Sequence, residues 1–121
     1  TLQILISGNV PDPDLWKNYP SYIYFDGRPS IHYSDDNLKR VGLISTSFRD
    51  YSKWNGSGAI GEEDRMKIDS LLGNAHKKGK KFRFWATPDF PQAWKELMAM
   101  KMDVIVTDDV ANLVTFLNDH Q

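Results

Sequence analysis

Side chains suited to binding an anion recur where short apolar runs of the sequence end. The runs LQILI, YIYF and VGLIST each precede a pair of polar or charged candidates: Ser7 and Asn9, Asp26 and Arg28, and Ser47 and Arg49. The planar guanidinium group of an arginine can donate two parallel hydrogen bonds to a phosphate. These positions therefore predict an anion-binding site. The alternatives are an ordinary Asp-Gly turn with an exposed Arg28, and Phe48 rather than its neighbours as the inward-pointing residue.

Two tryptophans are further candidates for contact with a substrate. Trp85 ends the run FRFW, where its ring could stack on a sugar or glycerol group, although a tryptophan in a strand is more often part of the core. Trp54 lies in a glycine-rich loop, residues 50–61, without apolar neighbours in sequence. Because binding residues concentrate on loops, this loop could cover a bound substrate. The alternative is an ordinary surface loop.

The spacing of the titratable residues indicates neither a catalytic group nor a metal site. His32, His76 and His120 are unrelated in spacing, and each is predicted to lie on the surface. Asp108 and Asp109 look like a metal-binding pair, but one of them is more simply the cap of the helix that follows. We therefore assign no catalytic residue and no metal ligand to this chain.

A cluster of four lysines stands in residues 77–81, KKGKK. Such a cluster can attract anionic lipid headgroups. The simpler interpretation is a solvated helix end, because lysines are favourable at the negative end of the helix dipole.

Strand-like and helix-like segments alternate along the chain and would position these candidates. Ile68, Leu71, Leu72 and Ala75 form one apolar stripe of a helix over residues 62–76. Gly79 suits the position just past its end. Asp89 can cap a second helix, which starts at Pro91. We expect strands at 2–6, 22–25, 41–46, 82–85 and 102–106, helices at 62–76, 91–100 and from 110 onward, and short turns near 15–16 and 35–38.

This alternation predicts an α/β fold with about five mostly parallel strands. Groups at the carboxyl ends of parallel strands share one rim, so the candidate ligands should lie together. Both a doubly wound sheet and half of an eight-stranded β/α barrel accommodate the pattern. A whole barrel takes about 250 residues, roughly twice the length of this chain.

Composition bounds the class of protein. The chain has 121 residues, enough for one domain spanning 1–121, with 40% hydrophobic and 26% charged residues. Its net charge of −1 argues against a nucleic-acid partner. The absence of cysteine excludes disulfides and thiolate metal sites. No apolar run reaches the roughly 18 residues of a membrane span. The chain opens at Thr1 inside a strand-like run, which favours a processed or truncated product.

Several motifs, in order along the chain, resemble one family. The segment HKKGKKFRFWATPDFPQAWKELMAMKMDVIVTDD is similar to the end of a glycerophosphodiester phosphodiesterase barrel. WATPD, in place of the usual W-T-V-N, is closer to the phosphatidylinositol-phospholipase-C-like branch, which has many secreted bacterial members. ISGN at 6–9, FDGR at 25–28, the S-x-S-x-R pattern ending at Arg49 and the Lys53-Trp54 pair also resemble that branch.

The resemblance implies the carboxyl-terminal half of a (β/α)8 barrel from a phosphodiester hydrolase active in lipid metabolism. The family's catalytic His, its acidic metal-binding pair and a further His belong to the amino-terminal half, and no position here matches them. The resemblance therefore implies a divalent cation, Mg or Ca, whose ligands lie outside this chain. It also implies a phosphodiester or lipid headgroup as ligand, and the missing amino-terminal half or a second copy as partner. A secreted or periplasmic location would follow from the bacterial branch. The rival from another class is a non-catalytic binding or assembly module that has kept the scaffold.

Overall fold

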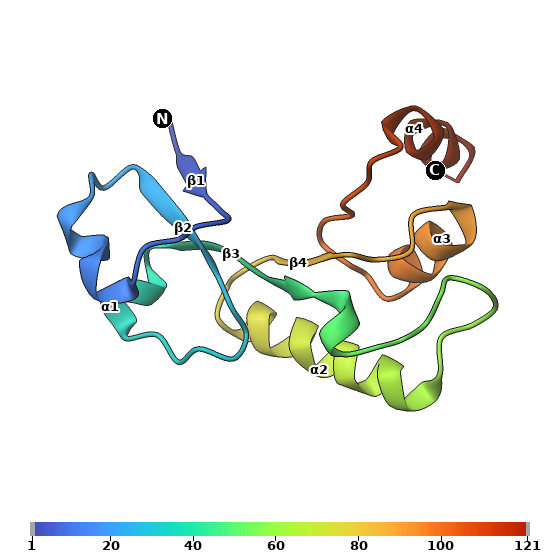
Figure 1. The fold of residues 1–121 in the computed structure, drawn as a ribbon, viewed down its shortest axis with the longest axis horizontal. Coiled ribbons are helices and arrows are strands. Elements are labelled where there is room, and N and C mark those ends of the chain that lie inside the picture. The colour runs from blue at the N-terminus through green and yellow to red at the C-terminus, as the bar shows by residue number, and fades with distance from the viewer. Residues whose placement is uncertain (1, 121) are drawn as a thin grey trace.

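A computed structural model describes residues 2–120 and has the strands and helices of an α/β protein (Figure 1). The strands are β1 (Ile4–Ile6), β2 (Ile23–Gly27), β3 (Val41–Ser47) and β4 (Phe82–Trp85). The α-helices are α1 (Asp35–Leu38), α2 (Glu62–Lys77), α3 (Pro91–Ala99) and α4 (Val110–Asp119). Two short 3-10 helices, η1 (Pro13–Asn18) and η2 (Phe48–Asp50), complete the elements.

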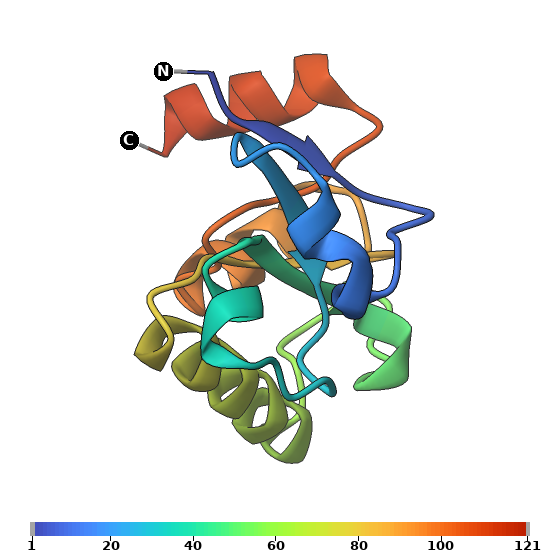
Figure 2. The same cartoon turned by 90° about the vertical axis from the view of Figure 1, so that its left-hand side faces the viewer.

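The four strands form one parallel sheet in the order β1-β2-β3-β4. Because each new strand adds to the same edge, the sheet has no point at which the strand order reverses. A doubly wound sheet requires such a reversal, so this order belongs to a barrel. The sheet curls, and Figures 1 and 2 show α2 lying along one side of it. The fold is a parallel α/β half-barrel.

The helix-covered face of the sheet holds the main core. Phe25, Ile44, Phe82 and Phe84 are at most 2% exposed and point to this face, where they meet the apolar stripe of α2. The predicted stripe residues Ile68, Leu72 and Ala75 are buried there, and Leu71 is partly buried against the same cluster. Burial of this stripe explains why the strongest helical pattern of the sequence became the longest helix.

The end of α2 follows the predicted chemistry. Gly79 adopts a φ of +72°, a left-handed conformation that glycine takes without steric cost. The backbone N–H groups of Gly79 and Lys80 then bind the carbonyl oxygens of His76 and Ala75 at 2.9 and 3.0 Å. The last-turn carbonyls are thereby satisfied.

The prediction of a fifth strand at 102–106 is wrong. Only one bridge, between Arg83 and Val104, joins this segment to β4. The Asp103 carboxylate accepts a hydrogen bond at 2.8 Å from the Phe82 N–H, at the start of β4. The Asp103 side chain thus binds the Phe82 N–H, which would otherwise be free to donate to a backbone carbonyl of a fifth strand.

The predicted cap of α3 is also corrected. Phe90, not Asp89, is the residue before the helix, while Pro91 occupies the first turn as expected. The Asp89 carboxylate instead accepts hydrogen bonds from the Trp94 indole N–H at 2.9 Å and the Asp108 backbone N–H at 2.8 Å. It therefore ties α3 to the segment that precedes α4. Asp109 stands at the cap position of α4, but its carboxylate binds the Asn112 side chain at 2.8 Å.

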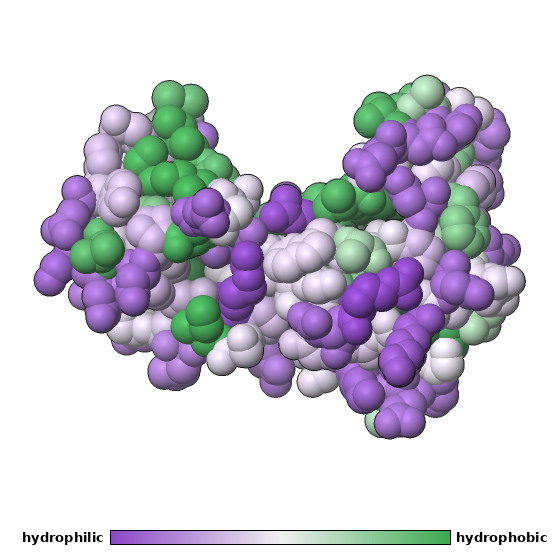
Figure 3. All heavy atoms as spheres, in the orientation of Figure 1, coloured by the Kyte–Doolittle hydropathy of each residue, from purple (hydrophilic) through white to green (hydrophobic). Residues whose placement is uncertain are grey.

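Apolar side chains remain exposed on the two ends of the arc. Figure 3 shows hydrophobic surface over β1 and over α4, on either side of a broad hollow. The exposed residues there include Leu2, Ile4, Leu5 and Tyr22 near β1, and Val110 and Val114 on α4. The arc is open, as expected for a half-barrel whose edge strands lack neighbours. Within residues 2–120, no helix is long and apolar enough to cross a membrane.

Candidate anion-binding site at the strand ends

The sheet face opposite α2 carries a polar cluster built from β2, β3 and β4, with its β2 members at the carboxyl end of that strand. Alternation along β4 explains why: Phe82 and Phe84 turn toward the core, so Arg83 and Trp85 must turn the other way. Ser45 on β3 pairs in register with Arg83. Asp26, near the end of β2, faces the same side. In a closed barrel this face is the interior, and its carboxyl-terminal rim is where ligands bind.

Asp26 is the centre of the cluster and is 4% exposed. Its Oδ1 accepts a hydrogen bond from the Ser45 hydroxyl at 2.5 Å. Its Oδ2 lies 3.2 Å from Nη1 of Arg28 and 3.1 Å from Nη2 of Arg83. A buried carboxylate is tolerated only when it is paired and hydrogen-bonded. Two arginines and a hydroxyl meet that need here.

Arg28 is held in place from several directions. Its Nη1 also donates to the Gly27 carbonyl at 3.1 Å and to Ser45 Oγ at 3.2 Å. Its guanidinium carbon lies 4.8 Å from the centroid of the Trp85 ring, a cation–π contact. Its backbone N–H donates to the Tyr33 hydroxyl oxygen at 2.9 Å. These contacts leave the side chain 30% exposed, so its other N–H groups can reach solvent or a ligand.

The glycine of the FDGR motif has a packing role. A side chain at Gly27 would come within 2.9 Å of Val41 and 3.3 Å of the Tyr33 hydroxyl. Glycine therefore lets Tyr33 approach the backbone of the turn. Burial raises the pKa of Tyr33, and the hydrogen bond from the Arg28 backbone only partly offsets this. Tyr33 is therefore a neutral hydroxyl that fixes the turn carrying Arg28.

A cavity of about 260 Å³ opens beside the cluster. Asp26 and Arg28 form one wall, and Tyr33, Trp16 and the loop around Gly8 form the others. The ring of Trp16 stacks on Phe25 at 4.6 Å, and its indole N–H binds the Pro11 carbonyl at 2.9 Å. The cavity thus has an aromatic wall, and its charged lining residues are Arg28, Asp26 and Asp12.

The structure brings together only part of the candidate set. Asp26, Arg28 and Trp85 are in contact, and Ser47 is the register partner of Trp85. Ser7 and Asn9 are exposed on either side of Gly8, at the edge of the cavity.

Arg49 and Trp54 form a separate pair. Arg49 Nη1 donates to the Trp54 carbonyl at 2.7 Å. The Trp54 ring packs edge-on against Phe48, which is fully buried, and its indole N–H binds the Ser57 carbonyl at 3.1 Å. Phe48 is therefore the inward-pointing residue after β3, which was the alternative considered from the sequence.

Ser45 and Arg83 were not among the residues predicted to bind a ligand. The signal for Arg83 was available in FRFW, since one charged residue between two phenylalanines in a strand must face away from their core. Ser45 belongs to the S-x-S-x-R pattern, and only pairing with β4 showed that it meets Asp26.

The cluster does not suit a divalent cation. Both oxygens of Asp26 are engaged, and two guanidinium groups would repel a metal ion. Among residues 2–120, no three histidine or acidic side chains gather as metal ligands would. Asp108 and Asp109 bind different partners: the Asp108 backbone N–H donates to Asp89, and the Asp109 carboxylate accepts from Asn112.

No histidine side chain within residues 2–120 is hydrogen-bonded to the cluster. His32 is exposed, and His120 contacts its own helix through the Phe116 carbonyl at 2.8 Å. His76 pairs with Asp103 at 2.7 Å, a partner that the sequence did not reveal. This pair lies at the start of β4, the opposite end of the strand from Trp85.

Fold and site together define a half-barrel of α/β type with a cationic rim. Comparison with protein families adds a specific likeness: residues 81–111 match the glycerophosphoryl diester phosphodiesterase family. This segment includes β4, α3 and the start of α4, with Arg83 and Trp85 inside it. The chain thus resembles the carboxyl-terminal half of a barrel of this type. Neither the curated proteins nor the solved structures provide a match.

Proposed function

We propose that this chain is the carboxyl-terminal portion of a metal-dependent phosphodiester hydrolase of the glycerophosphodiester phosphodiesterase and phosphatidylinositol-phospholipase-C-like superfamily. In this proposal it supplies the substrate-facing rim of the barrel. The observation that carries it is Arg28, a guanidinium group fixed at the end of β2 by Asp26 and Trp85 and open to the adjacent cavity.

The two arginines of the cluster support an anionic substrate. Within the cluster, Arg28 and Arg83 contribute one positive charge each and Asp26 one negative charge, while Asp12 is a second acid in the lining of the adjacent cavity. Nη1 of Arg28 serves the protein, while Nε and Nη2 form no hydrogen bond within residues 2–120. These two donors form the side of the guanidinium fork that can engage a phosphate oxygen pair. The stacking on Trp85 fixes the plane of the fork before the ligand arrives.

Hydrolysis also requires proton transfer to the leaving oxygen. Asp26 has no free oxygen to offer a leaving group, because Ser45 engages Oδ1 and the two arginines engage Oδ2. His32 is exposed in the loop beyond β2. We therefore assign proton transfer and metal binding to groups outside this chain, and phosphate orientation to Arg28.

The test is an assay of the purified 121-residue chain on glycerophosphodiesters with Mg²⁺ or Ca²⁺. The chain alone is expected to be inactive, and a mixture with an amino-terminal half that carries the family's catalytic residues is expected to hydrolyse the substrate. Arg28→Gln in the mixture should raise KM. Turnover by the chain alone that disappears in His32→Ala or Asp26→Asn would refute this division of roles.

A non-catalytic binding module is the second candidate. The complete hydrogen bonding of Asp26 favours it, since a site built this way holds an anion without offering a proton. The discriminating observation is the sequence upstream of this chain in its gene. A strand ending in histidine followed by a strand ending in E-x-D favours the hydrolase, and their absence favours the module.

A further inference from the structure

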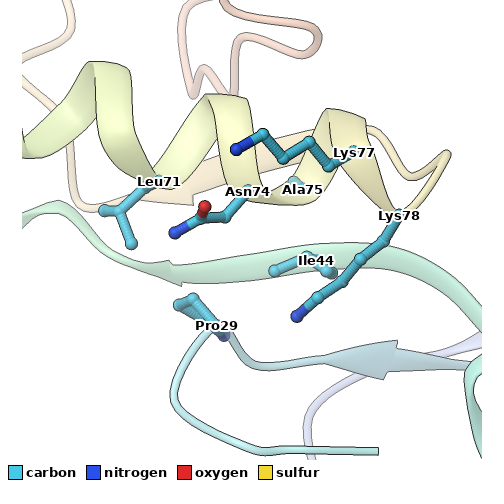
Figure 4. A pocket seen from close by; sticks show the side chains of 7 residues that line it. All are labelled: Pro29, Ile44, Leu71, Asn74, Ala75, Lys77 and Lys78. Atoms are coloured by element: carbon cyan, nitrogen blue, oxygen red, sulfur yellow. The ribbon is translucent and has the colours of Figure 1, made fainter.

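A second cavity, of about 190 Å³, lies between α2 and β3, on the face of the sheet opposite the rim cluster (Figure 4). Its floor is apolar and is formed by Ile44 of β3 with Leu71 and Ala75 of α2. Pro29, in the loop after β2, forms the facing wall. The connection from β2 to β3 carries only the four-residue helix α1. No full-length helix therefore packs beside α2 on this side, and the cavity remains.

The mouth of this cavity is cationic. Lys77 and Lys78 at the end of α2 line it together with Asn74. Figure 4 shows the Lys78 amino group reaching toward Pro29 and the Asn74 carboxamide directed into the space between helix and loop. Within residues 2–120, neither lysine has a carboxylate within 4.0 Å. The nearby helix-end carbonyls of Ala75 and His76 are already bonded to backbone N–H groups. The two ammonium groups are thus uncompensated.

A neighbouring, more open hollow extends this charge. Lys78 lines it as well, with Lys39, Lys80 and a single acid, Asp35. Burial lowers the pKa of Lys80, so a nearby anion would favour its charged form. This concentration of positive charge stands out in a chain whose net charge is −1.

We propose that this cavity binds a phosphomonoester that carries a small apolar group. A phosphomonoester carries about −1.5 to −2 charges at neutral pH and has three acceptor oxygens. Those oxygens match the Lys78 ammonium group and the Asn74 carboxamide N–H, while the apolar group would lie on Ile44 and Leu71. Lys77, whose amino group runs along α2, adds positive charge at the mouth. The site is separate from the rim, because Ile44 and Ser45 point to opposite faces of β3. It also lies away from the open edges of the arc, since β3 has neighbours on both sides.

The experiment is an NMR titration of the chain with phenyl phosphate, following the Asn74 side-chain amide and the methyl groups of Ile44 and Leu71. These signals should shift in a saturable manner. Lys78→Gln should weaken the affinity about tenfold, as expected for loss of one charge-assisted hydrogen bond. Asn74→Asp, which places a negative charge in an exposed wall position, should weaken it at least as much. Lys95→Gln on α3 removes the same charge at an exposed site away from the cavity and should leave the affinity unchanged.

Further arms identify the ligand and the site. Inorganic phosphate should bind more weakly than phenyl phosphate, because it leaves the apolar floor uncovered. Arg28→Gln should not alter the titration; if it abolishes binding while Lys78→Gln does not, the anion sits at the rim, which would overturn this inference and support the proposed function. Absence of saturable shifts overturns it as well. Binding to phosphatidylserine vesicles without binding of phenyl phosphate would identify the lysines as a membrane contact instead.

Discussion

Arg28 lies against the face of Trp85, with its guanidinium carbon 4.8 Å from the ring centroid. The two residues come from the ends of β2 and β4, and β3 runs between these strands. Asp26 also holds Arg28, through an ion pair of 3.2 Å. The arginine is therefore held by both a carboxylate and an indole before any ligand binds, which reduces the entropy lost on binding.

Asp26→Asn should destabilise the chain. The substitution keeps the size of the side chain but leaves Arg28 and Arg83 without their shared carboxylate. Since both arginines are partly exposed, we expect a loss of about 1–3 kcal/mol in the free energy of unfolding. Urea unfolding followed by circular dichroism measures it. Asp69→Asn, at an exposed position of α2, serves as control and should change stability by less than about 0.5 kcal/mol. Equal stability of the two variants would contradict the central role of Asp26.

Arg28→Gln and Arg49→Gln should separate the two arginine candidates. Arg28 faces the rim cavity, whereas Arg49 is bound to the Trp54 carbonyl in its own loop. We expect Arg28→Gln to weaken binding of a glycerophosphodiester to the rim by about tenfold or more, and Arg49→Gln to have little effect. Titration calorimetry gives both affinities. A larger effect from Arg49 would relocate the anion site to the end of β3.

Acidification should remove the stabilisation contributed by Asp89. Burial by itself raises the pKa of this carboxyl group. Hydrogen bonds from the Asp108 backbone, the Thr107 hydroxyl and the Trp94 indole lower it by more than burial raises it, so the pKa lies below the usual 3.8. A depressed pKa in the folded state means that the contribution is complete above the unfolded pKa and is lost as pH falls through the folded one.

The measurement is the free energy of unfolding as a function of pH for the parent chain and Asp89→Asn. The variant should be less stable at neutral pH, and the gap should narrow below about pH 4. Asp108→Asn, at an exposed neighbouring side chain, should follow the parent curve. A constant gap at all pH values would mean that the charge of Asp89 contributes nothing.

Leu5→Lys should reduce association of the chain with a second copy or with an added amino-terminal half. Leu5 is 43% exposed on the edge strand β1, which pairs with β2 on one side only, and a lysine there opposes addition of a further strand. Sedimentation velocity over a concentration series should show the parent associating and the variant remaining monomeric. Met66→Lys on α2 is the control, because Met66 is 64% exposed but lies away from the sheet edges. A parent chain that stays monomeric and does not bind the added half would refute this prediction.

Local sequence patterns predicted most elements of this fold because their determinants are local. The stripe of α2 and the Gly79 stop depend on neighbours three or four residues apart, and β4 was predicted with its observed bounds, Phe82–Trp85. The likeness of residues 81–111 to a phosphodiesterase family could likewise be recognised from motifs that follow one another along the sequence. Strand alternation alone left a doubly wound sheet and a half-barrel equally open.

Tertiary structure decided everything that depends on pairing between distant segments. The order β1-β2-β3-β4 selected the half-barrel. Asp103 looks like an ordinary loop residue in the sequence, but its carboxylate binds the Phe82 N–H where a fifth strand was predicted to pair. Asp89 looks like a helix cap, but its carboxylate binds the backbone of the distant Asp108 instead. The same holds for the rim: Asp26 and Arg28 were visible as a motif, but Ser45 and Arg83 joined them only through strand register, which a single sequence does not encode locally.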